Sequence, residues 1–370
     1  MTGVSFIRRS AVTFITGVLL VAALAVPAAT SQAAELKKVR IGVATTFLGI
    51  TYPWLMMPQA LGYWKDEGYD VEVVPIGGSL QVVQQLVGGG VDIGQINASV
   101  IIQANVVNSI PVRAFMTNGV IDWSIAVPSD SGIKTVADLK GKKIGVFSLA
   151  SGGIPLLKSY LAKSGLSPDN DVQLIAVGLG APAVQALKSK QVDALMFWGP
   201  ANAGFENAGL SLRYMRDPAW LTFPDFSMTA LDKTIKQDPK MIEAIARGAA
   251  KATVFAMANP DCVRKIQWMK WPDSKPTGAD ADILAKHDLN LLNAQLDTMK
   301  TTLKLSPSGL WGQANSDAYA RLQAFMTQVG LIGKTAPASN FVVEDEGFYK
   351  RVNDFDHDAI VASAKACDLK

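Results

Sequence analysis

The chain has 370 residues, of which 49% are hydrophobic and 18% are charged, and its formal net charge is +3. This length predicts two domains that each bury a core, and the composition excludes a solvated disordered tail or a coiled coil. Two of the positive charges, Arg8 and Arg9, lie in a removable N-terminal segment. The rest of the chain is therefore close to neutral, which argues against a nucleic-acid partner.

The first 33 residues have the organisation of a secretory signal. Arg8 and Arg9 precede an almost continuous apolar run over residues 11–26, and Ser31-Gln32-Ala33 forms a small-residue cleavage sequence. The apolar run is shorter than the roughly 20 residues that a membrane-spanning helix needs. We therefore expect residues 1–33 to be removed and the mature protein to lie in the periplasm without a direct membrane anchor.

An internal repeat divides the remainder of the chain. Residues 71–94 align without a gap to residues 172–195, at a constant offset of 101. Each copy has the pattern of a strand, a glycine-rich turn, an amphipathic helix and a second strand that begins with Val-Asp. Chance similarity between generic βαβ units is the alternative, but the ungapped length and the matching turn glycines favour two related βαβ halves with parallel sheets.

The periodicity predicts the following elements in chain order. The first half has strands near residues 39–44, 71–76, 92–95 and 112–117, with helices near 54–65, 80–87 and 99–108. A strand at 124–127 crosses into the second half, which has strands near 143–147, 172–177, 194–197 and 212–215, with helices near 153–164, 182–189 and 201–207. A return strand at 226–230 leads to helices near 239–258, 282–298, 316–329 and 356–366, which we expect to pack on the first half.

The loops at the carboxyl ends of these strands are rich in Trp, Ser, Thr, Asn and Gly and carry few charges. Ligands of open parallel sheets bind at these ends, so the composition predicts a pocket of stacking surfaces and directional hydrogen bonds. Trp54, Trp123 and Trp198 are candidates for an aromatic clamp, with core packing as the alternative for each. Ser151 and Gly152 precede an apolar helix, where they fit either anion binding or simple helix capping.

No recognised catalytic or metal motif accompanies these loops. Residues 178–183 read GxGxxA, but the acid expected about 20 residues further on is missing, which argues against dinucleotide binding. The only histidines, His287 and His357, have no ligand spacing to a cysteine, so we expect no metal and no cofactor. Cys262 and Cys367 could pair in an oxidising compartment or remain as two buried thiols, and their spacing does not decide between these states.

Several motifs together resemble one family. They are the opening ATTFLGITYPWLMMPQALGYWKDEGYDVEVVPI, the paired QQLVGGGVDIG and QALKSKQVDAL, and KTVADLKGKKIGVFSLASGG. The chain resembles periplasmic solute-binding proteins of ABC importers in the nitrate/sulfonate/taurine group, which includes a pyrimidine-precursor branch of the thiamine synthesis type.

The resemblance implies an α/β chain with a type II periplasmic-binding fold, in which two βαβ lobes are joined by a hinge and followed by a helical C-terminal extension. The hinge strands are expected near residues 124–128 and 226–230. The expected division is a signal peptide at 1–33, lobe 1 at 34–125, lobe 2 at 126–227, and a return to lobe 1 with the extension at 228–370.

The same resemblance implies a set of ligand-binding residues in the strand-end loops. Together with the tryptophans considered above, they are Thr46, Tyr52, Trp54, Gly78, Ser79, Asn97, Ala98, Trp123, Ser148, Ser151, Gly152 and Trp198. These loops lack a clear Lys or Arg, which favours a larger, partly aromatic or neutral organic ligand over a small inorganic anion.

The expected function is therefore capture of a small organic solute (sulfonate-like, aromatic or pyrimidine-like) by hinge closure. Delivery to the transmembrane subunits of an ABC permease would follow. We expect a monomer that is not an enzyme. The alternatives are a pyrimidine-precursor synthase on the same fold, whose cysteine-rich motif has no counterpart here, and a ligand-loaded partner of a membrane sensor.

Overall fold

The computed structural model describes residue 5 and residues 35–369, so the expected signal segment lies outside the described residues apart from residue 5. Residues 36–369 belong to one compact unit. Among residues 35–369, no helix combines the length and the apolar character needed to cross a membrane.

The first lobe is built on a mixed sheet with the strand order β2-β1-β3-β10-β4. Its strands are β1 (Lys37–Val43), β2 (Tyr69–Pro75), β3 (Ile93–Asn97), β4 (Val112–Thr117) and β10 (Phe226–Leu231). The strands β1, β2 and β3 pair in parallel, whereas β10 runs antiparallel to both of its neighbours. The connecting helices of this lobe are α1 (Pro53–Ala60), α2 (Ser79–Gly88) and α3 (Ala98–Val106).

The second lobe repeats this arrangement with the strand order β7-β6-β8-β5-β9. Its strands are β5 (Ser124–Pro128), β6 (Lys142–Val146), β7 (Val172–Ala176), β8 (Ala194–Phe197) and β9 (Leu212–Met215). Its helices are α4 (Gly153–Lys163), α5 (Ala181–Lys188) and α6 (Gly199–Asn207), with the short 3-10 helices η1 (Val136–Leu139) and η2 (Pro218–Thr222). Here too β6, β7 and β8 are parallel and β5 is the antiparallel strand.

The two sheets match strand for strand, which confirms the expected α/β architecture of two related lobes. The antiparallel strand of each sheet comes from the other half of the chain, because β5 follows the first-lobe strand β4 and β10 follows the second-lobe strand β9. The expected lobe boundaries at 125/126 and 227/228 fall inside β5 and β10, each of which belongs whole to one sheet. The segments that connect the lobes are residues 118–123 and 216–225.

The Val-Asp pair at the end of each repeat has the same structural role in both lobes. The Asp92 carboxylate accepts the backbone N–H of Arg40 at 2.8 Å, and the Asp193 carboxylate accepts the backbone N–H of Lys143 at 2.8 Å. In both cases the backbone N–H of the aspartate also donates to the carbonyl of the same partner. The repeated aspartate, which directly precedes β3 in one lobe and β8 in the other, therefore joins that strand to the parallel strand beside it.

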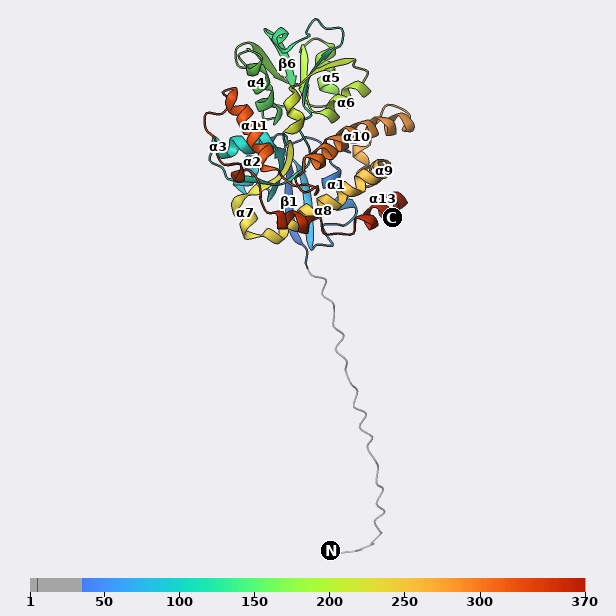
Figure 1. Ribbon diagram of the computed structural model, residues 1–370. Coiled ribbons are helices and arrows are strands. Elements are labelled where there is room, and N and C mark those ends of the chain that lie inside the picture. Colours follow the sequence, from blue (N-terminus) through green and yellow to red (C-terminus); the bar gives the residue numbers. More distant parts are fainter. Residues whose placement is uncertain (1–4, 6–34, 370) are drawn as a thin grey trace, which may run out of the picture. The chain divides into compact units, whose positions relative to one another are not determined.

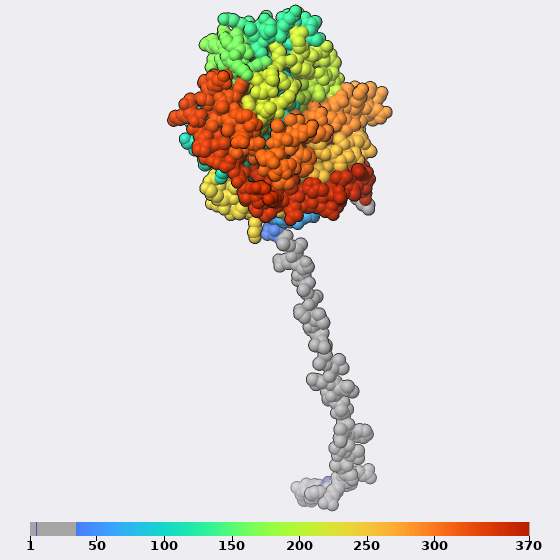
Figure 2. Space-filling view, in the orientation of Figure 1, coloured from blue at the N-terminus to red at the C-terminus, as the bar shows by residue number. Residues whose placement is uncertain are grey.

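The C-terminal extension is helical and contacts both lobes. It contains α7 (Asp232–Gln237), α8 (Pro239–Ala258), α9 (Pro260–Lys270), α10 (Ala281–Leu305), α11 (Ser316–Gln328), α12 (Glu346–Val352) and α13 (His357–Ala366), with the 3-10 helices η3 (Pro272–Ser274) and η4 (Ala338–Asn340). As expected, α8 packs on α1 of the first lobe, but α10 also packs on α6 and α11 on α4 of the second lobe (Figure 1). In the space-filling view, the orange residues of α10 lie directly against the yellow-green residues of the second lobe (Figure 2).

Three helices were not expected from the sequence, namely α7, α9 and α12. The pair Asn259-Pro260 ends α8, as predicted, but it also starts α9. The side chain of Asn259 accepts the backbone N–H of Cys262 at 3.1 Å, and Pro260 occupies the first helical position, where a missing N–H costs nothing. Helix α1 is shorter than expected because Gly62, at φ 78°, turns the chain soon after Ala60.

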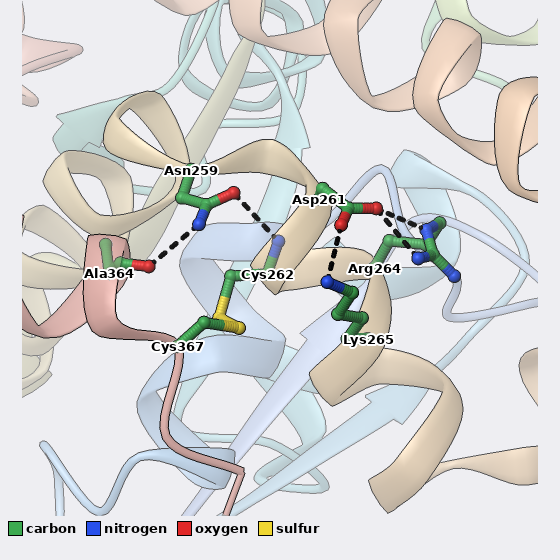
Figure 3. Close-up of a disulfide and its surroundings, with 7 residues drawn as sticks. All are labelled: Asn259, Asp261, Cys262, Arg264, Lys265, Ala364 and Cys367. Atoms are coloured by element: carbon green, nitrogen blue, oxygen red, sulfur yellow. Dashed lines mark hydrogen bonds and ion pairs between the residues drawn. A yellow bond between two sulfur atoms is a disulfide. The ribbon is translucent and has the colours of Figure 1, made fainter.

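Cys262 and Cys367 form a disulfide that joins the start of α9 to the end of α13 (Figure 3). Asn259 supports the same junction, because its side-chain N–H group donates to the carbonyl of Ala364 at 2.9 Å. The bridge closes a loop with a sequence separation of 105 residues, and so it anchors the C-terminal helix to the body of the extension.

We expect the double variant Cys262→Ala/Cys367→Ala to lose about 2–4 kcal/mol of unfolding free energy, because the cross-link restricts the unfolded chain. Urea denaturation followed by circular dichroism measures this loss. Dithiothreitol should destabilise the parent protein to a similar extent and leave the double variant unchanged. Equal stability of the oxidised parent and the double variant would contradict a stabilising bridge.

Candidate functional site

A cavity of about 440 Å³ lies between the two lobes and the C-terminal extension. Its walls come from the loop after β1, from α5 and α6 of the second lobe, and from η3 and α10. The lining residues are Thr45, Phe47, Gly49, Ile50, Thr51 and Tyr52; Leu179, Gly180, Ala181, Val184, Gln185 and Lys188; Trp198, Pro200, Ala201, Gly204, Phe205 and Ala208; and Ser274, Asp288 and Leu291. This size and this mostly apolar lining are typical of sites for small organic molecules.

Helical periodicity explains how α5 and α6 line the cavity. On α5 the lining positions are 181, 184, 185 and 188, which lie on one helix face. On α6 and its ends the lining positions are 200, 201, 204, 205 and 208, again on one face. The α6 face contains Ala201, Gly204 and Ala208, and these small side chains leave the space that the cavity occupies.

Trp198 is the aromatic centre of the site. It immediately precedes α6 and contacts rings from both lobes and from a connecting segment. Its ring centroid lies 5.3 Å from that of Trp123, 6.0 Å from that of Phe147 and 6.4 Å from that of Phe226. Trp198 therefore lies both in the cavity wall and at the junction of the lobes. We expect its position to change when the lobes move relative to each other.

The two connecting segments run antiparallel beside each other. The backbone N–H of Asp225 donates to the carbonyl of Gly119 at 2.9 Å, and that of Ile121 donates to the carbonyl of Phe223 at 3.1 Å. The hinge was expected near β5 and β10, which are strands within the two sheets, with a register shift between Met228 and Thr229 in the pairing of β10 with β4. The crossing segments between the sheets are residues 118–123 and 216–225. The connection between the lobes is therefore a paired, hydrogen-bonded ribbon.

Three buried carboxyl groups lie on these segments, Asp122 on the first and Asp217 and Asp225 on the second. Asp217 forms an ion pair with Lys163 at 2.6 Å, and the other two have no cationic partner among the described ion pairs. Asp122 accepts the backbone N–H of Gly199 at 2.9 Å, at the start of α6. Asp225 accepts the indole N–H of Trp123 at 2.9 Å and also the side-chain N–H of Asn97. These contacts connect the ribbon to the second lobe through Asp122 and to the first lobe through Asp225.

Burial raises the pKa of the Asp122 carboxyl to about 6, although the Gly199 N–H and the charge of Arg216 act in the opposite direction. Burial also raises the pKa of Asp225 well above its ordinary value, and the nearby Asp122 charge adds to this effect. The ribbon thus holds two carboxyl groups that bind protons more readily than exposed ones.

Loops that were expected to bind ligand meet directly across the lobes. A Cβ atom on Gly78 would lie 2.6 Å from the carbonyl oxygen of Ala150, and a Cβ atom on Gly152 would overlap Asn97. The hydroxyl of Ser99 lies 3.2 Å from the carbonyl oxygen of Gly152. The structure therefore has its lobes in contact at these loops.

The structure divides the expected site residues into four groups. Tyr52 and Trp198 line the cavity. A second group belongs to the loops that meet across the lobes, or lies next to them: Gly78, Ser79, Asn97, Ala98, Ser148, Ser151 and Gly152.

The third group consists of two buried tryptophans that do not line the cavity. Trp123 packs on Trp198 behind the cavity wall, and Trp54 is fully buried, where its indole N–H donates to Gln95 at 3.2 Å. Thr46 is exposed, and its neighbour Thr45 lines the cavity instead. The hydroxyl of Ser151 accepts the backbone N–H of Gly153 at 3.2 Å, but the N-cap position of α4 is Gly152, and no side chain caps this helix.

Sequence reasoning missed the cavity residues that lie outside the strand-end loops. Lys188 lies next to the end of the helix predicted at 182–189 within the second repeat, and its place on the face that contains Ala181 and Val184 was readable from helical spacing. Asp288 and Leu291 lie on a helix about 100 residues further along the chain, and no local pattern connects them to the cavity. With Lys188 and Asp288 in its wall, the cavity carries charges that the loop composition did not predict.

The described residues contain no cluster of three or more His, Cys, Asp or Glu side chains that could hold a metal ion.

Residues 54–262 match a family model described as NMT1/THI5 like. A relative from Brucella abortus (strain 2308), named as a binding protein, is 30% identical over 232 residues, which cover 60% of this chain and 68% of the relative. A solved protein from Bordetella bronchiseptica RB50 has a TM-score of 0.64 at 25% identity and covers 86% of this chain and 98% of its own. The periplasmic aliphatic sulphonate binding protein SsuA from Escherichia coli has a TM-score of 0.54 at 19% identity, covers 83% of this chain and 92% of its own, and shares the fold.

The buried carboxyl pair predicts a pH dependence of stability. Because the folded-state pKa of Asp122 is raised from 3.8 to about 6, the folded protein binds more protons than the unfolded chain within this range. This contribution to the unfolding free energy is therefore fully present below pH 4 and is lost as the pH rises through 6. Asp225 acts in the same direction.

We expect Asp122→Asn to remove part of this dependence, because the amide oxygen can still accept the Gly199 N–H but does not ionise. Relative to the variant, the parent protein should lose about 2–3 kcal/mol of unfolding free energy between pH 4 and pH 7. Urea denaturation at several pH values measures the difference, with the exposed Asp130→Asn as control. Parallel pH profiles of the parent and Asp122→Asn would refute the assignment.

Proposed function

We propose that this chain, which belongs to the NMT1/THI5-like family, captures a small organic solute in the periplasm and delivers it to an ABC permease. The observation that carries the proposal is the mostly apolar cavity between two lobes that are joined by a paired ribbon. A ligand in this position touches both lobes at once, so it binds the closed arrangement better than the open one. The periplasmic binding-protein fold shared with SsuA is consistent with this use.

A thermal-shift screen across sulfonates, aromatic acids, pyrimidines and amines identifies the ligand. A compound at 100 times its Kd adds about 2.7 kcal/mol to the unfolding free energy, which is readily detected. Delivery to a permease is tested by uptake of the labelled compound into cells that lack the gene, with and without complementation. Turnover of the compound by the purified protein would instead support the enzyme alternative.

We expect Trp198→Ala to weaken binding of the compound found in the screen by at least tenfold, or about 1.4 kcal/mol, because it removes the central aromatic surface of the cavity. Isothermal titration calorimetry measures the affinity. Trp311→Ala removes a half-buried indole that does not line the cavity, and it should leave the affinity unchanged. Equal affinities of the parent and Trp198→Ala would show that the ligand binds elsewhere.

The variant Gly152→Ala tests whether the two lobes close at these loops, and it changes no residue that lines the cavity. Gly152 has a helical backbone conformation that alanine also adopts, at φ −62° and ψ −17°, but a Cβ atom there would overlap Asn97 across the lobes. We expect this variant to show a larger radius of gyration by small-angle X-ray scattering and a weaker ligand affinity. Gly132→Ala, which places its Cβ atom in open space, is the matched control. Unchanged scattering and affinity in Gly152→Ala would contradict closure at these loops.

A further inference from the structure

Helix α10 supplies a wall of the cavity that lies outside the region matched by the family model. That region ends at residue 262, whereas Ser274, Asp288 and Leu291 belong to η3 and α10. The same helix packs on α6 of the second lobe, where the side chain of Asn207 donates to the carbonyl of His287 at 3.0 Å. The part of the site that α10 contributes therefore lies in the C-terminal extension.

Asp288 is the buried charge in this wall, with a residual exposure of 8%. One oxygen, Oδ2, accepts the indole N–H of Trp268 at 2.7 Å. Within residues 35–369, Oδ1 receives no hydrogen bond and no cation forms an ion pair with this carboxylate. The nearby Arg264 guanidinium instead pairs with Asp261 at 2.7 Å and lies over the Trp268 ring at 4.4 Å.

The other charged side chain of the cavity is placed differently. Lys188 is exposed, and its ammonium group donates to the carbonyl of Ala208 at 3.3 Å. Burial raises the pKa of Asp288, although the Trp268 N–H and the charges of Arg264 and His287 act in the opposite direction. The cavity thus combines apolar walls with a largely buried carboxylate, for which Trp268 is the hydrogen-bond donor given among the described residues.

We propose that Asp288 determines ligand specificity by accepting a hydrogen bond from an amino or ammonium group on a ligand with an aromatic-sized apolar body. A desolvated carboxylate gains most from a charge-assisted hydrogen bond, whereas an anionic group at the same place is repelled and loses its hydration. Trp198, Phe205 and Leu291 supply the surface that covers the apolar body. This inference rests on the proposed function and specifies the ligand class for the same cavity.

Two probes of the same shape and opposite charge test the proposal, namely 2-phenylethylamine and 3-phenylpropionate. We expect the parent protein to bind the amine at least tenfold more tightly than the acid, as measured by calorimetry at pH 7. Asp288→Asn keeps an acceptor for Trp268 but loses the charge, and it should weaken binding of the amine at least tenfold. Asp297→Asn makes the same charge change at an exposed position of α10 and should have no effect.

A second variant tests whether the probes bind in this cavity, independently of the charge on Asp288. Leu291→Trp fills the cavity from the α10 side and should weaken binding of both probes, whereas Ile283→Trp, at an exposed position of α10, should weaken neither. Thermal melts establish that each variant is folded.

The outcomes distinguish this inference from the proposed function. The inference is overturned if the parent protein binds neither probe, if it prefers the acid, or if Asp288→Asn retains its affinity for the amine. If Trp198→Ala abolishes binding of a screened compound while Asp288→Asn and Leu291→Trp do not, the cleft site stands and the role of α10 is refuted. If none of these variants affects binding of that compound, the cavity itself is not the site and both proposals fail.

Discussion

Each sheet of this protein is completed by a strand from the other half of the chain, and the rest of the structure depends on this exchange. Because β5 and β10 are each held on both sides by strands of the lobe they enter, the two chain crossings are anchored at both ends. The crossings then lie beside each other as a hydrogen-bonded ribbon between the lobes. Such a connection permits the lobes to rotate about the ribbon and keeps their strand-end loops facing each other.

The groups buried at the ribbon link this connection to the ligand cavity. Asp122 holds the backbone at the start of α6, next to Trp198, and Asp225 holds Trp123 and Asn97. A change in the angle between the lobes therefore also changes the position of an aromatic wall of the cavity. The cost of burying these carboxyl groups is offset by hydrogen bonds that exist only when the lobes and the ribbon are assembled.

The C-terminal extension adds a constraint that the two repeats alone do not have. It is anchored on the first lobe through α8 and α1, and its own end is fixed by the disulfide. From this base, α10 and α11 reach the second lobe at α6 and α4. Opening of the lobes must therefore separate these contacts as well, and the extension takes part both in the cavity wall and in the energetics of closure.

The sequence by itself determined the strands, most of the helices and the pairing of the two halves, because these depend on patterns within about 25 residues. The repeat, its turn glycines and its Val-Asp pairs are local signals, and both aspartates make the same backbone contact in the two lobes. The sequence also indicated candidate tryptophans, but it did not show which of them line the cavity. Trp54 and Trp198 occur in similar local patterns, yet Trp54 is packed in the core and Trp198 lines the cavity. Tertiary structure alone decided the pairing of Cys262 with Cys367, the burial of Asp122 and Asp225, and the entry of Asp288 into the cavity. The physical reason is that burial and charge pairing depend on which distant segments share the same space, and helical or strand periodicity carries no information about that.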